Sequence, residues 1–273
     1  MHRALLTALV MISLLATCTR GNPPTTPQLP EAMPDLPALR IYDLSTRIDG
    51  QQYACKVMVN ESATIGGQAL LFLHGAGECG TDGVRQLHVG LPRYAMQRPD
   101  RWPFVIIAPQ KPTVNSEWED HDKAVMALLD KAAEMGLFDP NRLAITGLSQ
   151  GGHGTIAIAG LHPERFKAAA PVCPYVRPVF DRERERIQRE PAAADNPDII
   201  AAAEKIRGIP VWLHHGDADS VVPVSESRAL FGALRALNAE PRFSEYPDVD
   251  HNSWDNAYVD RDFSEWLLHH LGE

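Results

Sequence analysis

The sequence predicts an α/β domain in which helices flank a mostly parallel central sheet. Short, wholly apolar runs recur along the chain, for example at 69–73 and 104–109, as is typical of strands that are covered on both faces. Segments with apolar residues at helical spacing lie between such runs, for example at 122–135. The chain has 273 residues, of which 44% are hydrophobic, so one large core is possible. Strands that alternate with helices indicate a single α/β unit.

The expected elements follow one another without an internal repeat. Predicted strands lie at 52–60, 69–73, 104–109, 143–146, 168–172, 211–214 and 242–246. Predicted helices lie at 122–135, 150–161, 224–237 and 262–271. The alternation of predicted strands and helices is interrupted at 174–208, where residues 181–186 alternate in charge. This segment is either a solvated helix or loop, or a cap that covers the site and shapes its pocket, and both alternatives stay open.

The N-terminal residues are expected to form a targeting signal. Arg3 precedes an apolar run at 4–16 that is too short to span a bilayer comfortably and suits a signal peptide over 1–17. Leu-Ala-Thr-Cys at 15–18 resembles a bacterial lipobox, which implies lipidation of Cys18, although Thr17 departs from the usual Gly, Ala or Ser. The alternative is an ordinary cysteine near a conventional cleavage site. A Pro-rich tether at 18–38 would then lead into a catalytic domain at 39–273.

We therefore expect an exported protein of the bacterial cell envelope, anchored by lipid in the periplasm or at the cell surface, or otherwise secreted. The formal net charge of −9 argues against nucleic acid or an anionic membrane surface as the main partner. Three cysteines would remain after cleavage, namely Cys55, Cys79 and Cys173. One disulfide is possible among them, and the sequence does not choose the pair. No P-loop, HExxH or zinc-type cluster is present, so we expect no cofactor and no metal.

The chemistry is expected to centre on Gly-Leu-Ser-Gln-Gly at 147–151. A predicted strand precedes Ser149 and a predicted helix follows it, which is the pattern of a nucleophile elbow. Gly147 and Gly151 have no Cβ, so strand and helix could approach closely there. The start of the helix would direct free N–H groups toward a developing oxyanion. The alternative is a Gly-rich turn that carries a surface serine.

Three further motifs follow predicted strands. His-Gly-Ala-Gly-Glu lies at 74–78, His-Gly-Asp-Ala-Asp-Ser-Val-Val-Pro at 215–223, and Asp-His-Asn-Ser-Trp at 250–254. Together with the serine motif at 147–151, the last two give the order serine, acid, histidine along the chain. Over about 70–268 the chain resembles the α/β-hydrolase superfamily, in particular its small serine esterases, including carboxylesterase, phospholipase-like and predicted-peptidase relatives. The resemblance implies the α/β-hydrolase fold and a catalytic triad that needs no cofactor.

The resemblance also implies a role for each matched residue. Ser149 would attack the acyl carbon, His251 would take its proton, and Asp219 would orient and stabilise the imidazolium. Backbone N–H groups of Ala76 and Gln150 would form the oxyanion hole, so the Gln150 side chain should matter little.

Several other residues near these motifs need an interpretation. Asp217 competes with Asp219 as the acid, although the resemblance favours Asp219 and makes Asp217 a turn residue. His74 is expected to brace the oxyanion loop, and His214 to be packed within its strand. The candidates for the substrate pocket are His153, Trp118 and Trp254, although an aromatic residue is more often core than pocket.

The expected activity is hydrolysis of small-molecule carboxylic esters through an acyl-enzyme on Ser149. The same machinery can cleave amides, so a serine peptidase of this fold is the runner-up. A third alternative is a catalytically idle binding protein displayed at the surface. The intact Ser, Asp and His argue against that alternative, because a relic would be expected to have lost one of them.

Overall fold

The computed structural model describes residues 11–13, 39–176, 180–181, 186–187 and 191–272. The strands of the main sheet are β1 (Met11–Ser13), β2 (Arg40–Ile48), β3 (Gln51–Val59), β4 (Gly67–Leu73), β5 (Val105–Gln110), β6 (Phe138–Leu148), β7 (Ala169–Val172), β10 (Trp212–Gly216) and β11 (Arg242–Tyr246). Their spatial order is β1-β2-β3-β5-β4-β6-β7-β10-β11. Within the described strands of this sheet, only β2 with β3 and β3 with β5 pair antiparallel. The sheet is therefore mostly parallel, as predicted.

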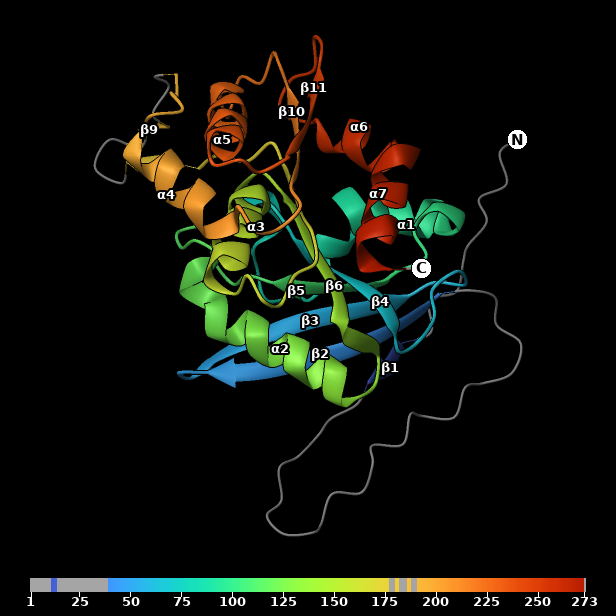
Figure 1. The fold of residues 1–273 in the computed structure, drawn as a ribbon. Coiled ribbons are helices and arrows are strands. Elements are labelled where there is room, and N and C mark those ends of the chain that lie inside the picture. The colour runs from blue at the N-terminus through green and yellow to red at the C-terminus, as the bar shows by residue number, and fades with distance from the viewer. Residues whose placement is uncertain (1–10, 14–38, 177–179, 182–185, 188–190, 273) are drawn as a thin grey trace, which may run out of the picture.

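Helices cover both faces of this sheet (Figure 1). They are α1 (Gly90–Gln97), α2 (Asp122–Glu134), α3 (Gln150–Leu161), α4 (Pro197–Ile206), α5 (Ser225–Ala236), α6 (Trp254–Val259) and α7 (Arg261–Leu271). Short 3-10 helices lie at Ala76–Glu78, Arg85–Leu87, Pro99–Arg101 and Glu119–His121. A separate two-stranded pair joins β8 (Phe180–Asp181) to β9 (Arg186–Ile187).

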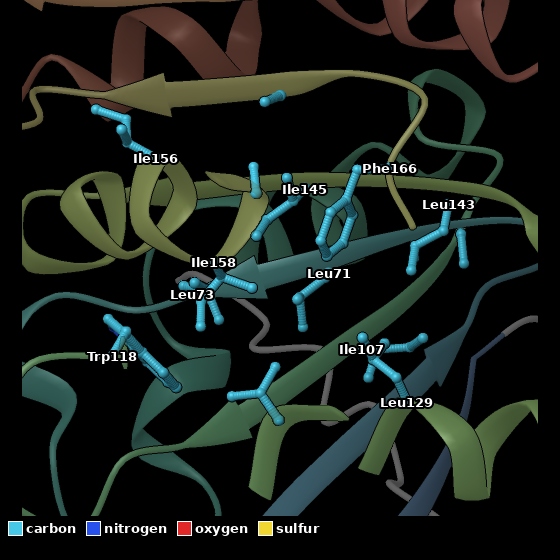
Figure 2. Close-up of a cluster of buried hydrophobic side chains, with 14 of the residues drawn as sticks. Leu71, Leu73, Ile107, Trp118, Leu129, Leu143, Ile145, Ile156, Ile158 and Phe166 are labelled. Carbon is cyan, nitrogen blue, oxygen red and sulfur yellow. The ribbon is translucent and has the colours of Figure 1, made fainter. Parts of the chain in front are cut away.

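The two faces of the sheet build two cores because strand side chains alternate in direction. In β4, Leu71 and Leu73 point toward the core under α2, α3, α4 and α5, part of which is drawn in Figure 2. Leu70 and Phe72 point to the opposite core, under α1, α6 and α7. All four side chains are fully buried. The uninterrupted apolar run at 69–73 is therefore explained by burial on both faces.

The structure adds elements that periodicity did not indicate. β2 was not expected, nor were α1 and α6, both of which are short. In the segment 174–208, α4 packs Ile199, Ala203 and Ile206 into the core that also holds Leu71 and Leu73. Its start carries a signal that could have been recognised: Asn196 caps the helix by accepting from the Asp198 N–H at 2.9 Å, and Pro197 is its first residue.

Part of what the sequence predicted lies outside the described residues. This holds for the signal peptide at 1–17 except for 11–13, for Cys18 and the tether at 18–38, and for much of the charged run at 181–186. The cap alternative for 174–208 is therefore answered only from 191 onward, where α4 is part of the main fold. Among the described residues, no helix is both long and apolar enough to cross a membrane.

Candidate active site

The predicted site residues gather at one edge of the sheet. Ser149 follows β6, Asp219 lies just beyond β10, and His251 lies just beyond β11. The loop that begins at His74 follows β4. These four strands run parallel, so their carboxyl ends share one edge, where ligands bind in open α/β sheets. The fold thus unites motifs that lie about a hundred residues apart.

Ser149 occupies a strained turn between β6 and α3. Its φ of 55° and ψ of −117° are unusual for a residue with a side chain. The turn is held by the Ser149 N–H, which donates to the Val172 carbonyl at 2.9 Å. A Cβ on Gly151 would lie 1.9 Å from the Leu73 carbonyl oxygen, and one on Gly147 would lie 2.3 Å from the Gly151 oxygen. The close approach predicted for both glycines is confirmed.

A continuous hydrogen-bond chain links the three residues. The Ser149 hydroxyl lies 2.9 Å from His251 Nε2, and His251 Nδ1 lies 2.7 Å from Asp219 Oδ2. The Asp219 side chain is fully buried, whereas 17% of the His251 side chain is exposed. Nδ1 of the imidazole thus faces the buried carboxylate, and Nε2 faces the serine. This arrangement allows His251 to accept the serine proton while its other N–H stays bonded to the carboxylate.

Asp219 remains a carboxylate in this environment. Burial by itself would raise its pKa, but hydrogen bonds from His215 and His251 outweigh that effect and hold the pKa well below its usual range. Oδ1 also accepts from the backbone N–H groups of Val221 and Val222, at 2.8 and 2.7 Å. The negative charge needed opposite an imidazolium is therefore present over the whole physiological pH range.

The competing acid, Asp217, has a different place. Its Oδ1 accepts from the Asp248 N–H at 2.7 Å, which ties the loop after β10 to the loop after β11. The neighbouring Asp250 carboxylate accepts from the Ser220 N–H at 2.8 Å and from the His251 N–H at 2.7 Å. The geometry therefore brings Asp219 to the histidine and leaves Asp217 as a residue that fixes a turn.

The loop after β4 reaches the elbow at its first residues. A Cβ on Gly75 would lie 2.9 Å from a methyl carbon of Leu148, the residue before Ser149. Ala76 begins one helical turn and Gln150 begins α3, so neither N–H has an acceptor within its own helix. Both candidate oxyanion donors thus come from helix starts on the two sides of this contact.

His74 braces this loop, as expected. Its Nε2 accepts from the Lys111 N–H at 2.9 Å, and its Nδ1 donates to the Gly75 carbonyl at 2.6 Å. Burial lowers the pKa of His74 to about 4, which keeps the ring neutral at physiological pH. A neutral ring has one acceptor and one donor nitrogen, which is what these two contacts need.

The three candidates for the substrate pocket lie in different surroundings in the structure. Trp118 does not line a pocket, which corrects the prediction. It is 1% exposed and lies in the core under α2, α3, α4 and α5 (Figure 2). Its ring covers Gly154, where a Cβ would come within 2.5 Å of the ring. Its Nε1–H donates to the His74 carbonyl at 3.1 Å. Trp254 is half-buried with its ring 5.5 Å from that of His251, edge to face, so it adjoins the base.

His153, the third candidate, lies in the first turn of α3. Its ring stacks on Tyr175, and its nitrogens contact the Glu119 carboxylate at 3.1 Å and the Tyr175 carbonyl at 3.2 Å. Burial would lower its pKa, but the Glu119 carboxylate outweighs this effect and raises it. His153 therefore belongs to a polar cluster with Glu119 and Tyr175 beside the elbow.

A polar cluster next to Gln150 was missed by the sequence analysis. The Gln150 side-chain amide donates to the Glu117 carboxylate at 3.1 Å and to the Val114 and Ser116 carbonyls at 3.2 Å. Tyr175 donates its hydroxyl to Glu117 at 2.6 Å. The Gln150 side chain thus fixes the loop before α2. No pattern in the sequence indicates these contacts, because they join residues from separate segments that belong to no common motif.

Cys55, Cys79 and Cys173 are free thiols in the structure. One set of metal-type ligand atoms occurs among the described residues, where Cys173, Asp219 and His251 lie within 4.8 Å of one another. Asp219 and His251 already bond each other there, and burial raises the pKa of the Cys173 thiol far above its usual value.

Comparisons with known proteins place the chain among hydrolases. Residues 114–273 match the model of the prolyl oligopeptidase family. Dipeptidyl peptidase 4 of Felis catus is 31% identical over 127 residues, which cover 44% of this chain and 17% of that protein. Acylamino-acid-releasing enzyme 2 of Oryza sativa subsp. japonica is 28% identical over 148 residues, covering 46% and 19%. The chain thus spans less than a fifth of these relatives.

Solved structures match over more of the chain. A thermostable esterase superposes with a TM-score of 0.67 at 28% identity, covering 84% of this chain and 62% of that one. An S-formylglutathione hydrolase from Agrobacterium tumefaciens superposes with a TM-score of 0.61 at 18% identity, covering 84% and 95%, and supports the fold alone. With more than half of its residues in the family match, and with this fold, the chain belongs to the prolyl oligopeptidase family and is a serine hydrolase of the α/β-hydrolase superfamily.

Proposed function

We propose that the chain hydrolyses carboxylic esters through an acyl-enzyme on Ser149, with His251 as the base and Asp219 as the acid of a triad. The observation that carries the proposal is the hydrogen-bond chain from Ser149 through His251 to Asp219, with bonds of 2.9 and 2.7 Å. The strained turn at Ser149 supports it, because such strain is retained at sites where it serves a function.

The chemistry follows from these contacts. The Ser149 oxygen bonds to the acyl carbon as its proton passes to His251 Nε2. The tetrahedral intermediate collapses, the bond to the alcohol breaks, and the departing oxygen takes the proton from His251. Water then attacks the acyl-enzyme by the same path in reverse, giving the carboxylic acid and free Ser149. Throughout, the Asp219 carboxylate keeps the His251 ring oriented and opposes its positive charge.

The oxyanion of the intermediate is proposed to accept from the N–H groups of Ala76 and Gln150. Each is the first N–H of its helical turn and is directed outward from the helix start. Donors of this kind contribute about 3 kcal/mol each to transition-state stabilisation. Replacing the Gln150 side chain keeps its N–H, so we expect Gln150→Ala to act through the loop at 114–117 that this side chain holds.

Ester and amide bonds are both within reach of this machinery. Among solved structures that superpose on most of the chain, the thermostable esterase is 28% identical over 84% of it, whereas a putative dipeptidyl aminopeptidase IV from Bacteroides ovatus is 15% identical over 86%. The higher identity over a similar share of the chain favours the ester. The names of the relatives keep a peptidase as the second candidate. Both activities would use the same Ser149, His251 and Asp219, and the bond that is cleaved fastest distinguishes them.

The test is hydrolysis by the full chain of p-nitrophenyl esters from acetate to palmitate, beside p-nitroanilides of dipeptides and of acylated amino acids. We expect kcat/KM to be highest on an ester, and activity to be lost in Ser149→Ala. Ser62→Ala is the matched control, because Ser62 is exposed and lies far from the elbow in sequence. An anilide cleaved faster than every ester would make the protein a peptidase.

A fluorophosphonate probe tests the alternative of an idle binding protein. Such a probe bonds to an activated serine without needing a particular substrate. We expect labelling of the wild type and of Ser62→Ala, and none of Ser149→Ala. A folded wild type that does not label would refute the triad.

We also propose that the protein is exported and held to a membrane by a lipid on Cys18, with a small ester as its partner in the reaction. The support is the apolar run at 4–16 and the lipobox-like residues at 15–18. Cys18→Ala should move the protein from the membrane fraction to the soluble fraction. Equal membrane association of the variant would rule out the anchor.

A further inference from the structure

A second histidine contacts the carboxylate of the proposed triad. His215 Nε2 lies 3.1 Å from Asp219 Oδ2, the same oxygen that accepts from His251 Nδ1. The side chains of His215 and Asp219 are both 0% exposed. His215 has no described contact with Ser149, so any effect on the reaction must pass through Asp219.

The protonation of the His215 ring follows from its partners. Nε2 also lies 3.0 Å from the Val222 carbonyl oxygen, which can only accept, so Nε2 must carry a proton. In the neutral ring Nδ1 then accepts from the Ser227 hydroxyl, which lies 2.7 Å away. Ser227 is fully buried on α5. The two acceptors at Nε2 thus set the tautomer, and a hydroxyl from a helix on one face of the sheet holds the other nitrogen of the ring.

With the His215 N–H as a further donor, the Asp219 carboxylate accepts as many hydrogen bonds as its two oxygens allow. Its Oδ1 accepts from two backbone N–H groups and its Oδ2 from two imidazoles, which fills about four acceptor sites. Without His215, Oδ2 would keep His251 as its one partner, and rotation about the Cβ–Cγ bond would be limited by fewer hydrogen bonds. The angle at which Asp219 meets His251 would then be less well defined.

We propose that His215 is a positioning residue that holds Asp219 Oδ2 in the orientation His251 needs, with Ser227 as the support that holds the His215 ring in place. The proposal rests on the proposed function of Ser149, His251 and Asp219. It predicts a defect in the chemical step, because neither residue contacts the substrate-facing side of the serine. Substrate binding should be close to unchanged.

The test compares His215→Leu, which removes the donor, with His215→Gln, whose amide nitrogen can take the place of Nε2. We expect His215→Leu to lower both kcat and the rate of fluorophosphonate labelling by roughly 10- to 100-fold, with KM within about threefold. His215→Gln should recover most of that loss. Ser227→Ala should lower kcat by about two- to tenfold, because Nδ1 then loses its partner and the ring is held less firmly.

His214 supplies the matched control. It is the neighbouring residue on β10, it is equally buried, and it faces the opposite core, where it contacts Tyr246 and Phe263. We expect His214→Leu to lower the thermal midpoint as His215→Leu does, yet to keep kcat within about threefold of wild type, because it has no contact with Asp219.

A folded His215→Leu that keeps kcat within twofold would overturn the proposal, as would an equal loss of kcat in His214→Leu. If His215→Leu does not fold, Ser227→Ala decides: lower kcat at unchanged KM supports the proposal, and unchanged kcat overturns it. Labelling rates separate this inference from the choice of substrate. A wild type that labels but cleaves no ester refutes the esterase, while the variants still test His215. A wild type that does neither refutes both.

Discussion

His214 should make the folded protein sensitive to acid. Its ring is fully buried between Trp212 and Tyr246, and Nδ1 bonds the Tyr246 hydroxyl at 2.8 Å. Its Nε2 has no partner among the described residues. Burial lowers the pKa of His214 from 6.5 to about 3, because the apolar surroundings disfavour the charged ring. Above pH 3 the folded protein therefore holds this histidine neutral.

The sign of the effect follows from proton uptake. Below about pH 6.5 the unfolded chain binds a proton at this residue and the folded chain does not, so stability falls as pH falls. Each pH unit between the unfolded and folded values removes about 1.4 kcal/mol. From pH 7 to pH 4 the loss from His214 amounts to about 3 kcal/mol, a large share of the 5–15 kcal/mol that is usual for a domain.

The perturbation is His214→Phe, which keeps an aromatic ring in the same place and cannot titrate. Urea unfolding at pH 7, 6, 5 and 4 gives the free energy of unfolding of wild type and variant. We expect the wild-type value minus the variant value to fall by about 3 kcal/mol across this range. Phe104→Leu is the control: it changes a buried ring of the same core that does not stack on His214, and its difference from wild type should not depend on pH.

His74 and the buried carboxylates titrate alike in wild type and variant, so they cancel in the difference. A wild-type-minus-variant difference that stays constant from pH 7 to pH 4 would refute the reasoning, because it would show that His214 is protonated equally in the folded and unfolded chains.

The remaining predictions concern the proposed site. Asp219→Asn should lower kcat by about 10⁴-fold with the fold intact, checked by ester hydrolysis and circular dichroism, because the amide favours the wrong tautomer of His251. A loss under tenfold would contradict this role. Gly151→Ala should lower the free energy of unfolding by at least about 3 kcal/mol in urea, because its Cβ would lie 1.9 Å from the Leu73 oxygen. Gly208→Ala, which meets nothing within 4 Å, is the neutral control.

The elbow and the long strands were predictable because their signals are local. The apolar run at 69–73 indicates a buried strand, and the glycines around Ser149 indicate that a strand and a helix approach closely. Neither prediction requires knowing which segments pack against these residues. The antiparallel strand β2 was not predictable in this way. In its Arg40–Ile48 sequence, polar residues interrupt the apolar ones, and it is a strand because it pairs along its whole length with β3.

The separation of Trp118 from Trp254 shows a second limit. Both are tryptophans near site motifs, and nothing in the sequence distinguishes them. Trp118 became core because Gly154 lies against its ring and the His74 carbonyl accepts from its N–H. Trp254 is placed beside His251 by the start of α6. Which aromatic is buried depends on packing between distant segments, and this is a property of the folded chain.

The sequence by itself determined the class of the fold, the serine at its elbow, and the order in which the proposed acid and base follow, because each depends on a short motif next to a strand. Only the tertiary structure decided that Asp219 faces His251 while Asp217 ties two loops together, since both lie on the same turn two residues apart. It alone showed His215 and Ser227 behind Asp219. Such contacts join a strand, a helix and two loops, and three-dimensional packing sets them at distances that no local pattern encodes.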